Sequence, residues 1–184
     1  MLKNRQSEKL LNIVAFFVQN TRYCGKTKLF KLIYFLDFEH YSDTGRSVSG
    51  LDYYAWPMGP VPVELNDQIE SSDPKLTDAL EVSQKPLPGG KAMVVFTPKI
   101  DFDAKLFTRR ELRLMESLAQ EFNVAKADDM VEATHLENLP WHQVYEVEGR
   151  KQQLIPYDLA FRKAELDASS RTAREHREFT DNYK

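Results

Sequence analysis

Few side chains in this sequence could carry catalytic chemistry, and none lies in a recognisable catalytic pattern. Cys24 is the sole cysteine, and no nucleophile-elbow pattern surrounds any serine, so a thiol or hydroxyl nucleophile has no evident base. Asp37 and Glu39 are two residues apart on a predicted helix. Their carboxylates therefore point in different directions and do not form a paired acid and base. We expect no catalytic residue.

Patterns that bind metals or phosphates are also missing. The four histidines are His40, His135, His142 and His176. None forms the HExxH spacing or another close pair that would hold a metal ion. The seven glycines include no GxGxxG or GxxxxGK[ST] loop. We expect neither a metal site nor a cofactor.

Composition indicates a globular protein. The chain has 184 residues, of which 42% are hydrophobic and 29% charged, values close to those of ordinary soluble proteins. A net charge of −3 gives no overall attraction to nucleic acid or anionic lipid. The sequence shows no apolar run of membrane length and no signal-peptide pattern. With a single cysteine, these features predict a cytoplasmic protein that does not enter the membrane.

The segment KLFKLIYFLDFEHY, which starts at Lys28, predicts the element that positions the others. Its apolar residues nearly encircle a helix, since Leu29, Leu32 and Ile33 lie on one side and Phe30 and Tyr34 on another. A helix of this kind is typical of a protein interior. We predict a buried central helix over about residues 27–41.

The remaining pattern predicts a predominantly helical α+β fold. We expect extended segments at about 48–56 and 92–97 to pair as a small antiparallel β element, with a Pro- and Gly-rich loop from Val82 to Lys91. Thr108 and Glu111 match a capping box, which predicts a helix to about Phe122. Further helices are expected near 128–136 and from Pro140. We predict one domain over residues 1–166 and a charged tail, helical or disordered, over 167–184.

Nucleic-acid binding is an alternative suggested by two predicted helices, one that begins after Ser7 and ends before Asn20, and the central helix. With Gly25 in the turn between them, they imitate a helix-turn-helix, and Lys26, Lys28 and Lys31 open the second helix. A recognition helix needs a polar face for the bases, and this helix is too apolar for a DNA groove. Nucleic acid is therefore a possible but disfavoured partner.

A set of short motifs resembles the Panacea, or SocA-like antitoxin, domain family. The motifs are KLIYFLDFEHY, TG at Thr44, AW before GPV at Gly59, and ATHLENLPW ending at Trp141, and they span about three quarters of the chain. The main motif residues are Lys31, Tyr34, Gly45, Trp56, Gly59, Pro60, His135 and Trp141. Met58 departs from the aromatic or polar residue that members usually carry before Gly-Pro.

The resemblance implies a non-enzymatic antitoxin that neutralises a cognate toxin by direct protein-protein binding. Members are prokaryotic or phage proteins, usually encoded beside the toxin. Two other functions stay open: a regulator whose Lys26, Lys28 and Lys31 contact operator DNA, and an adaptor that delivers a partner to a protease through the tail after Asp167.

Most motif residues are expected to hold the fold together, with the toxin-specific surface elsewhere. We favour Trp56 as a core residue. Lys31 and Asp37 are candidates for a buried polar network with Tyr34 or His135, a structural role that we favour over a functional one. The candidate partner contacts are Tyr53, Tyr54, Met58 and Tyr145.

Overall fold

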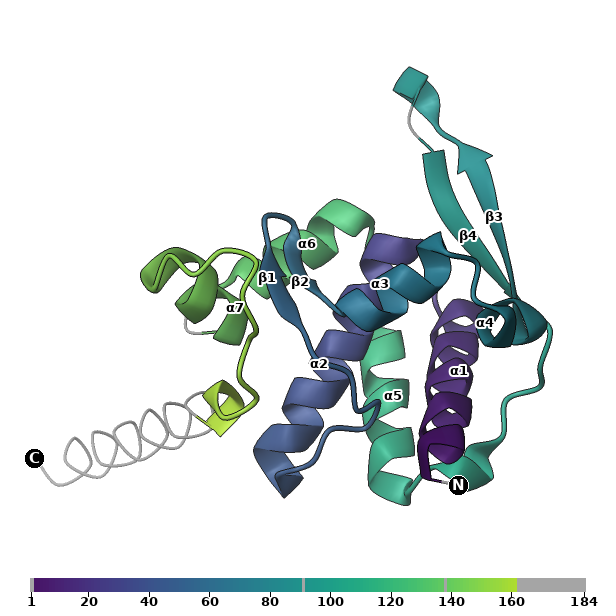
Figure 1. Ribbon diagram of the computed structural model, residues 1–184, viewed down its shortest axis with the longest axis horizontal. Helices are drawn as coiled ribbons and strands as arrows, with labels where there is room; N and C mark the ends of the chain where they lie inside the picture. The colour runs from purple at the N-terminus through teal and green to yellow at the C-terminus, as the bar shows by residue number, and fades with distance from the viewer. Residues whose placement is uncertain (1, 91, 138, 162–184) are drawn as a thin grey trace, which may run out of the picture.

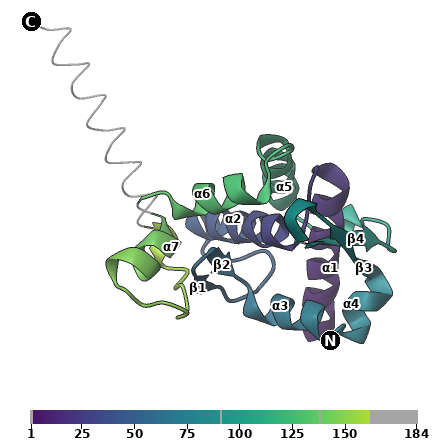
Figure 2. The same cartoon turned by 90° about the horizontal axis from the view of Figure 1, so that it is seen from above.

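Helix α2 (Lys26–Thr44) is the central element of the fold (Figure 1). The computed structural model describes residues 2–90, 92–137 and 139–161. Leu29, Leu32, Ile33 and Leu36 of α2 are fully buried, because neighbours cover the helix on several sides. Figure 2 shows α5 and α6 on one side of α2, with a small β-hairpin and α3 on the other. The predicted buried central helix is confirmed.

Helices α1 (Leu2–Asn20) and α5 (Arg109–Glu121) pack beside α2. The Thr108 hydroxyl accepts a hydrogen bond from the backbone N–H of Glu111, whose carboxylate accepts one from the Thr108 N–H. This capping box satisfies two N–H groups at the start of α5. The predicted start and end of this helix are confirmed.

The strands form two separate hairpins. Strands β1 (Tyr54–Trp56) and β2 (Gly59–Val61) pair antiparallel, with Trp56 opposite Gly59. Strands β3 (Leu80–Pro86) and β4 (Ala92–Pro98) form a longer hairpin that projects from the helices (Figure 1).

The predicted pairing of residues 48–56 with 92–97 is wrong. The short turn between β1 and β2 returns the chain on itself, so β1 finds its partner within a few residues. Strand β4 pairs instead with Leu80–Pro86, most of which we predicted as loop because of the nearby Pro and Gly residues. Those residues fall at the hairpin end, where they form the turn around the 3-10 segment η1 (Pro88–Gly90).

The other elements are short. They are α3 (Val63–Glu70), α4 (Pro74–Ala79), the 3-10 turn η2 (Ala104–Leu106), α6 (Ala127–His135), α7 (Pro140–His142) and a π-helical turn η3 (Gln143–Val147). The fold is therefore predominantly helical α+β, as predicted.

No described helix is long and apolar enough to cross a membrane. The predicted domain boundary at residue 166 and the tail over 167–184 lie outside the described residues.

Candidate functional site

Lys31 of α2 is hydrogen-bonded to the β1–β2 hairpin. The Lys31 side chain is buried, and its Nζ donates a hydrogen bond to the carbonyl oxygen of Pro60 at 2.8 Å. Burial lowers the pKa of Lys31 to about 7, since a low-dielectric site disfavours the charged ammonium. Lys31 therefore fixes the position of the hairpin backbone.

Gly59 allows the hairpin to approach α2 and α6 closely. Its φ is +94°, a backbone conformation that L side chains rarely adopt. A Cβ atom there would lie 2.7 Å from Thr134 Oγ1 and 2.9 Å from Lys31 Cε. Both the backbone angle and the space require glycine. The other motif glycine, Gly45, ends α2 with a φ of +68°, and its N–H donates to the Tyr41 carbonyl.

We expect Gly59→Ala to lower the free energy of unfolding by about 2 to 3 kcal/mol, from backbone strain and a steric clash together. Gly89 is a matched control, because its φ is +80° and no atom lies within 4 Å of a Cβ built there. Gly89→Ala should cost about 1 kcal/mol from strain alone. Urea unfolding of the two variants measures the difference, and equal losses would refute the role given to Thr134 and Lys31.

A stack of three rings from α6, α7 and η3 supports the other strand. The Trp141 indole Nε1–H donates to the Trp56 carbonyl oxygen at 2.9 Å. His135 stacks on Trp141 with ring centroids 3.7 Å apart, and Tyr145 lies against Trp141 at 4.6 Å. The ATHLENLPW motif thus anchors the hairpin that carries the AW and GPV motifs.

Two polar atoms beneath the hairpin have no hydrogen-bond partner within the described residues: the Tyr34 hydroxyl and His135 Nε2. Burial raises the pKa of the Tyr34 phenol, and the nearby Trp141 backbone only partly offsets this. Burial and the neighbouring Lys31 lower the pKa of His135. Lys31, Tyr34 and His135 therefore favour their neutral forms as pH rises above 7.

The titration of Lys31 predicts an unusual dependence of stability on pH. Because its pKa is about 7 when folded and near 10.5 otherwise, the unfolded chain binds more protons between these values. The free energy of unfolding therefore rises as pH increases from about 7 to 10.5, and this gain is lost as pH falls back from 10.5 to 7. Raising the pH from 7 to 9 should add about 2 kcal/mol to the free energy of unfolding.

Lys31→Met isolates this effect, because methionine has similar length and no charge to desolvate. Comparing urea midpoints at pH 7 and pH 9, we expect the wild-type chain to gain stability relative to Lys31→Met. Parallel behaviour of the two proteins would show that Lys31 titrates normally.

Asp37 belongs to a second, separate polar cluster. Its carboxylate accepts hydrogen bonds from the N–H groups of Val48 and Ser49 at 2.7 Å each, and from the Tyr53 hydroxyl at 2.6 Å. The hydroxyls of Ser49 and Tyr157 also donate to it. Burial raises the pKa of Asp37, and the donated hydrogen bonds oppose that shift. The expected network joining Lys31 and Asp37 through Tyr34 or His135 is therefore wrong.

The candidate contact residues differ in exposure. Met58, in the turn of the β1–β2 hairpin, is 58% exposed. Tyr54 and Tyr145 are half-buried. The expectation that Tyr53 contacts a partner is wrong, because Tyr53 is fully buried and its hydroxyl is bonded to Asp37. Trp56 is half-buried against the core, closer to the predicted core role than to an exposed anchor.

The lysines proposed to contact DNA do not form a basic surface. Lys28 and Lys31 are buried in α2, and Lys26 is ion-paired with Glu70. A DNA-reading surface made of these three lysines is therefore wrong. The tail invoked for a protease adaptor lies outside the described residues.

Lys28 instead joins two parts of the chain, a role that the sequence did not reveal. Its Nζ donates to the carbonyls of Arg22 and Ala125 at 2.7 and 2.8 Å, and to those of Phe122 and Asn123 at 2.6 and 3.1 Å. The last two carbonyls follow the end of α5, where the helix dipole is negative. Burial lowers the pKa of Lys28, although the four acceptors favour the ammonium form.

Cys24 is not set up as a nucleophile, and the described residues hold no cluster of metal ligands. Desolvation raises the pKa of the Cys24 thiol, which disfavours the nucleophilic thiolate. Within residues 2–90, 92–137 and 139–161, no three His, Cys, Asp or Glu side chains are grouped so that they could hold a metal ion. His176 lies beyond this part of the chain.

Comparison with known proteins identifies the family of this chain. Residues 29–142 match the family model described as antitoxin SocA-like, Panacea domain. Searches of curated proteins and of solved structures gave no significant match. The matched range holds the anchors of the β1–β2 hairpin from Lys31 to Trp141 and covers well over half of the chain. The chain therefore belongs to the SocA-like antitoxin family and carries its Panacea domain.

Proposed function

We propose that this chain is an antitoxin that neutralises a cognate toxin by direct binding in the cytoplasm, with no catalytic step of its own. The observation that carries the proposal is the family match over residues 29–142. The rigid support of the β1–β2 hairpin is consistent with a binding role, because preorganised surfaces lose little entropy on association.

The contact that we propose centres on Met58. Its side chain is exposed, while Pro60 nearby is hydrogen-bonded to Lys31 and Gly59 packs closely against Lys31 and Thr134. Methionine adapts to irregular apolar surfaces and is frequent at interfaces. Tyr54, at the start of β1, and Tyr145 in η3 would extend the contact, since half-buried aromatic side chains are frequent anchors.

Co-expression with the toxin encoded beside this chain tests the proposal. The wild-type chain should restore growth, and Met58→Asp should lose this protection because a desolvated carboxylate would face the toxin. Val124→Asp is a matched control, since Val124 is also an exposed apolar residue, at 64%, and lies after α5, outside the β1–β2 hairpin. Protection by Met58→Asp equal to that by Val124→Asp would exclude this contact. No protection by the wild-type chain would refute the antitoxin function.

A further inference from the structure

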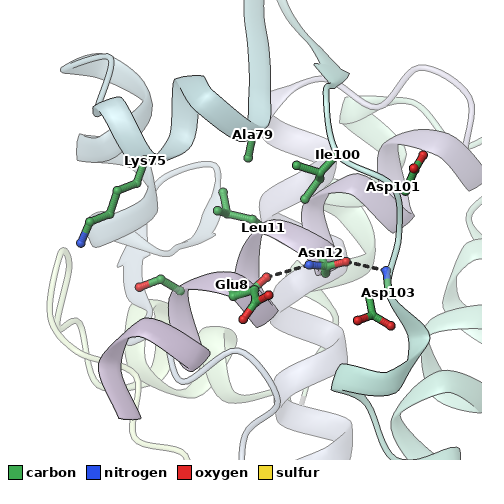
Figure 3. A pocket seen from close by; sticks show the side chains of 9 residues that line it. Glu8, Leu11, Asn12, Lys75, Ala79, Ile100, Asp101 and Asp103 are labelled. Atoms are coloured by element: carbon green, nitrogen blue, oxygen red, sulfur yellow. Dashed lines mark hydrogen bonds between the residues drawn. The ribbon is translucent and has the colours of Figure 1, made fainter. Parts of the chain in front are cut away.

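A groove that no sequence motif marks runs along helix α1 and the start of α4. It consists of two hollows of about 470 and 730 Å³ that share the residues Ser7, Leu11 and Lys75. Figure 3 shows the smaller hollow, where side chains of α1 face the segment that follows β4. Both volumes are in the range of pockets that hold part of a partner molecule.

Apolar side chains lie in both hollows of this groove, and apolar surface prevails in the smaller one. Leu11, Ala79 and Ile100 line the smaller hollow, and Leu10 and Leu76 line the larger one. Leu11 and Ile100 are half-buried, so part of their apolar surface is open to solvent. An occupant with apolar side chains would remove this surface from water.

The rim of the groove is acidic. Its carboxylates belong to Glu8, Glu64, Asp73, Asp101 and Asp103. Lys75 is the one cation among the described residues that line it. None of the five carboxylates takes part in the four ion pairs found in the described part of the chain. The rim therefore has unbalanced negative charge that would attract a cationic partner.

One wall of the groove is held in place by Asn12, which is buried. Its Nδ2 donates to the Glu8 carbonyl at 3.0 Å, and its Oδ1 accepts from the Asp103 N–H at 2.8 Å (Figure 3). These bonds tie the segment after β4 to α1. The groove is thus formed before any partner binds, which lowers the entropy cost of association.

We infer that this groove is a docking site for a basic, amphipathic segment of the toxin. The inference rests on the proposed antitoxin function and adds the chemistry of the partner. Lysine and arginine side chains of the segment would meet the acidic rim, and its apolar side chains would cover Leu11 and Ile100. In Figure 2 the β1–β2 hairpin, α3 and α4 lie toward the same side of α2, so one toxin could contact both the groove and the hairpin.

A charge-reversal experiment tests the inference. The groove variant is Glu8→Lys, Glu64→Lys and Asp101→Lys in the full chain. The control variant is Glu116→Lys, Glu121→Lys and Glu132→Lys, which makes the same change in net charge at exposed sites of α5 and α6. The probe is the purified product of the neighbouring toxin gene, made in a cell-free system, and affinity is measured at low and high salt.

We expect the groove variant to bind this toxin at least about tenfold more weakly than the wild type at 50 mM salt, and the difference to shrink at 500 mM. The control variant should stay within about threefold of the wild type. Synthetic peptides that tile the toxin should compete with it for the wild-type chain only when they carry net positive charge.

Other outcomes overturn the inference in distinguishable ways. Wild-type affinity in the groove variant, or competition only by neutral or acidic peptides, would remove the groove from the interface while leaving the antitoxin function intact. Concentration-dependent self-association of the wild-type chain that the groove variant lacks, with unchanged toxin affinity, would assign the groove to a second copy of the chain. No binding of the toxin by the wild-type chain would refute both proposals.

Discussion

Replacing Lys28 with methionine is expected to lower the free energy of unfolding by about 3 to 5 kcal/mol, because a buried cation that satisfies several backbone acceptors is lost. The ammonium contacts carbonyls of Arg22, Phe122, Asn123 and Ala125. Methionine keeps most of the aliphatic packing but donates no hydrogen bond. The segment after α5 and the connection between α1 and α2 would then no longer be hydrogen-bonded to the same side chain.

Lys26→Met is the matched control for this prediction. Lys26 lies on the same helix and makes an exposed ion pair with Glu70, so its loss should change stability little. Chemical denaturation of both variants with one probe of helix content measures the effect. Similar midpoints for the two variants would show that the Lys28 contacts contribute little to stability.

Replacing Asp37 with leucine is expected to have a comparable effect, about 3 to 5 kcal/mol, because it leaves several buried donors without an acceptor. The donors are the N–H groups of Val48 and Ser49 and the hydroxyls of Ser49, Tyr53 and Tyr157. These residues lie before β1 and after η3. Loss of the carboxylate should therefore loosen both segments that flank the hairpin.

Asp37→Asn should cost less than Asp37→Leu, since one amide oxygen still accepts from the two backbone N–H groups. Asp43→Leu is the control, because Asp43 is exposed and paired only with Arg110 among the described contacts. Hydrogen exchange at residues 48–56, measured together with denaturation, locates the effect. Unchanged exchange there in Asp37→Leu would contradict the anchoring role.

Sequence patterns that act over a few residues predicted their elements well. The apolar residues of α2 surround the helix, so its burial follows from composition alone. The capping box at Thr108 depends on two side chains three residues apart, and it fixed the start of α5.

Features that depend on residues far apart in the sequence could not be predicted from such local patterns. Tyr53 was predicted as a contact because an aromatic residue in a short strand has two possible faces, and its partner Asp37 lies one element earlier. Lys28 bonds to carbonyls about 95 residues away, which a helix pattern does not reveal. A lysine within an otherwise apolar stretch was the available signal, because buried lysines require acceptors.

The acidic groove was missed for the same reason. Its rim combines Glu8 of α1, Glu64 of α3 and Asp101 after β4, and these residues share no spacing in the sequence. Its floor includes Leu10 and Leu76, which also belong to the hydrophobic core. A surface of this kind becomes visible only when the elements are placed together.

The antitoxin proposal is tested most directly by calorimetric titration of the purified full chain into the purified product of the neighbouring toxin gene. We expect a saturable complex with a Kd below about 1 μM, which corresponds to a binding free energy more favourable than about −8 kcal/mol. The complex should co-elute in size-exclusion chromatography, and its formation should abolish toxin activity. No heat of binding and no co-elution, with toxin activity unchanged at an excess of the chain, would contradict neutralisation by direct binding.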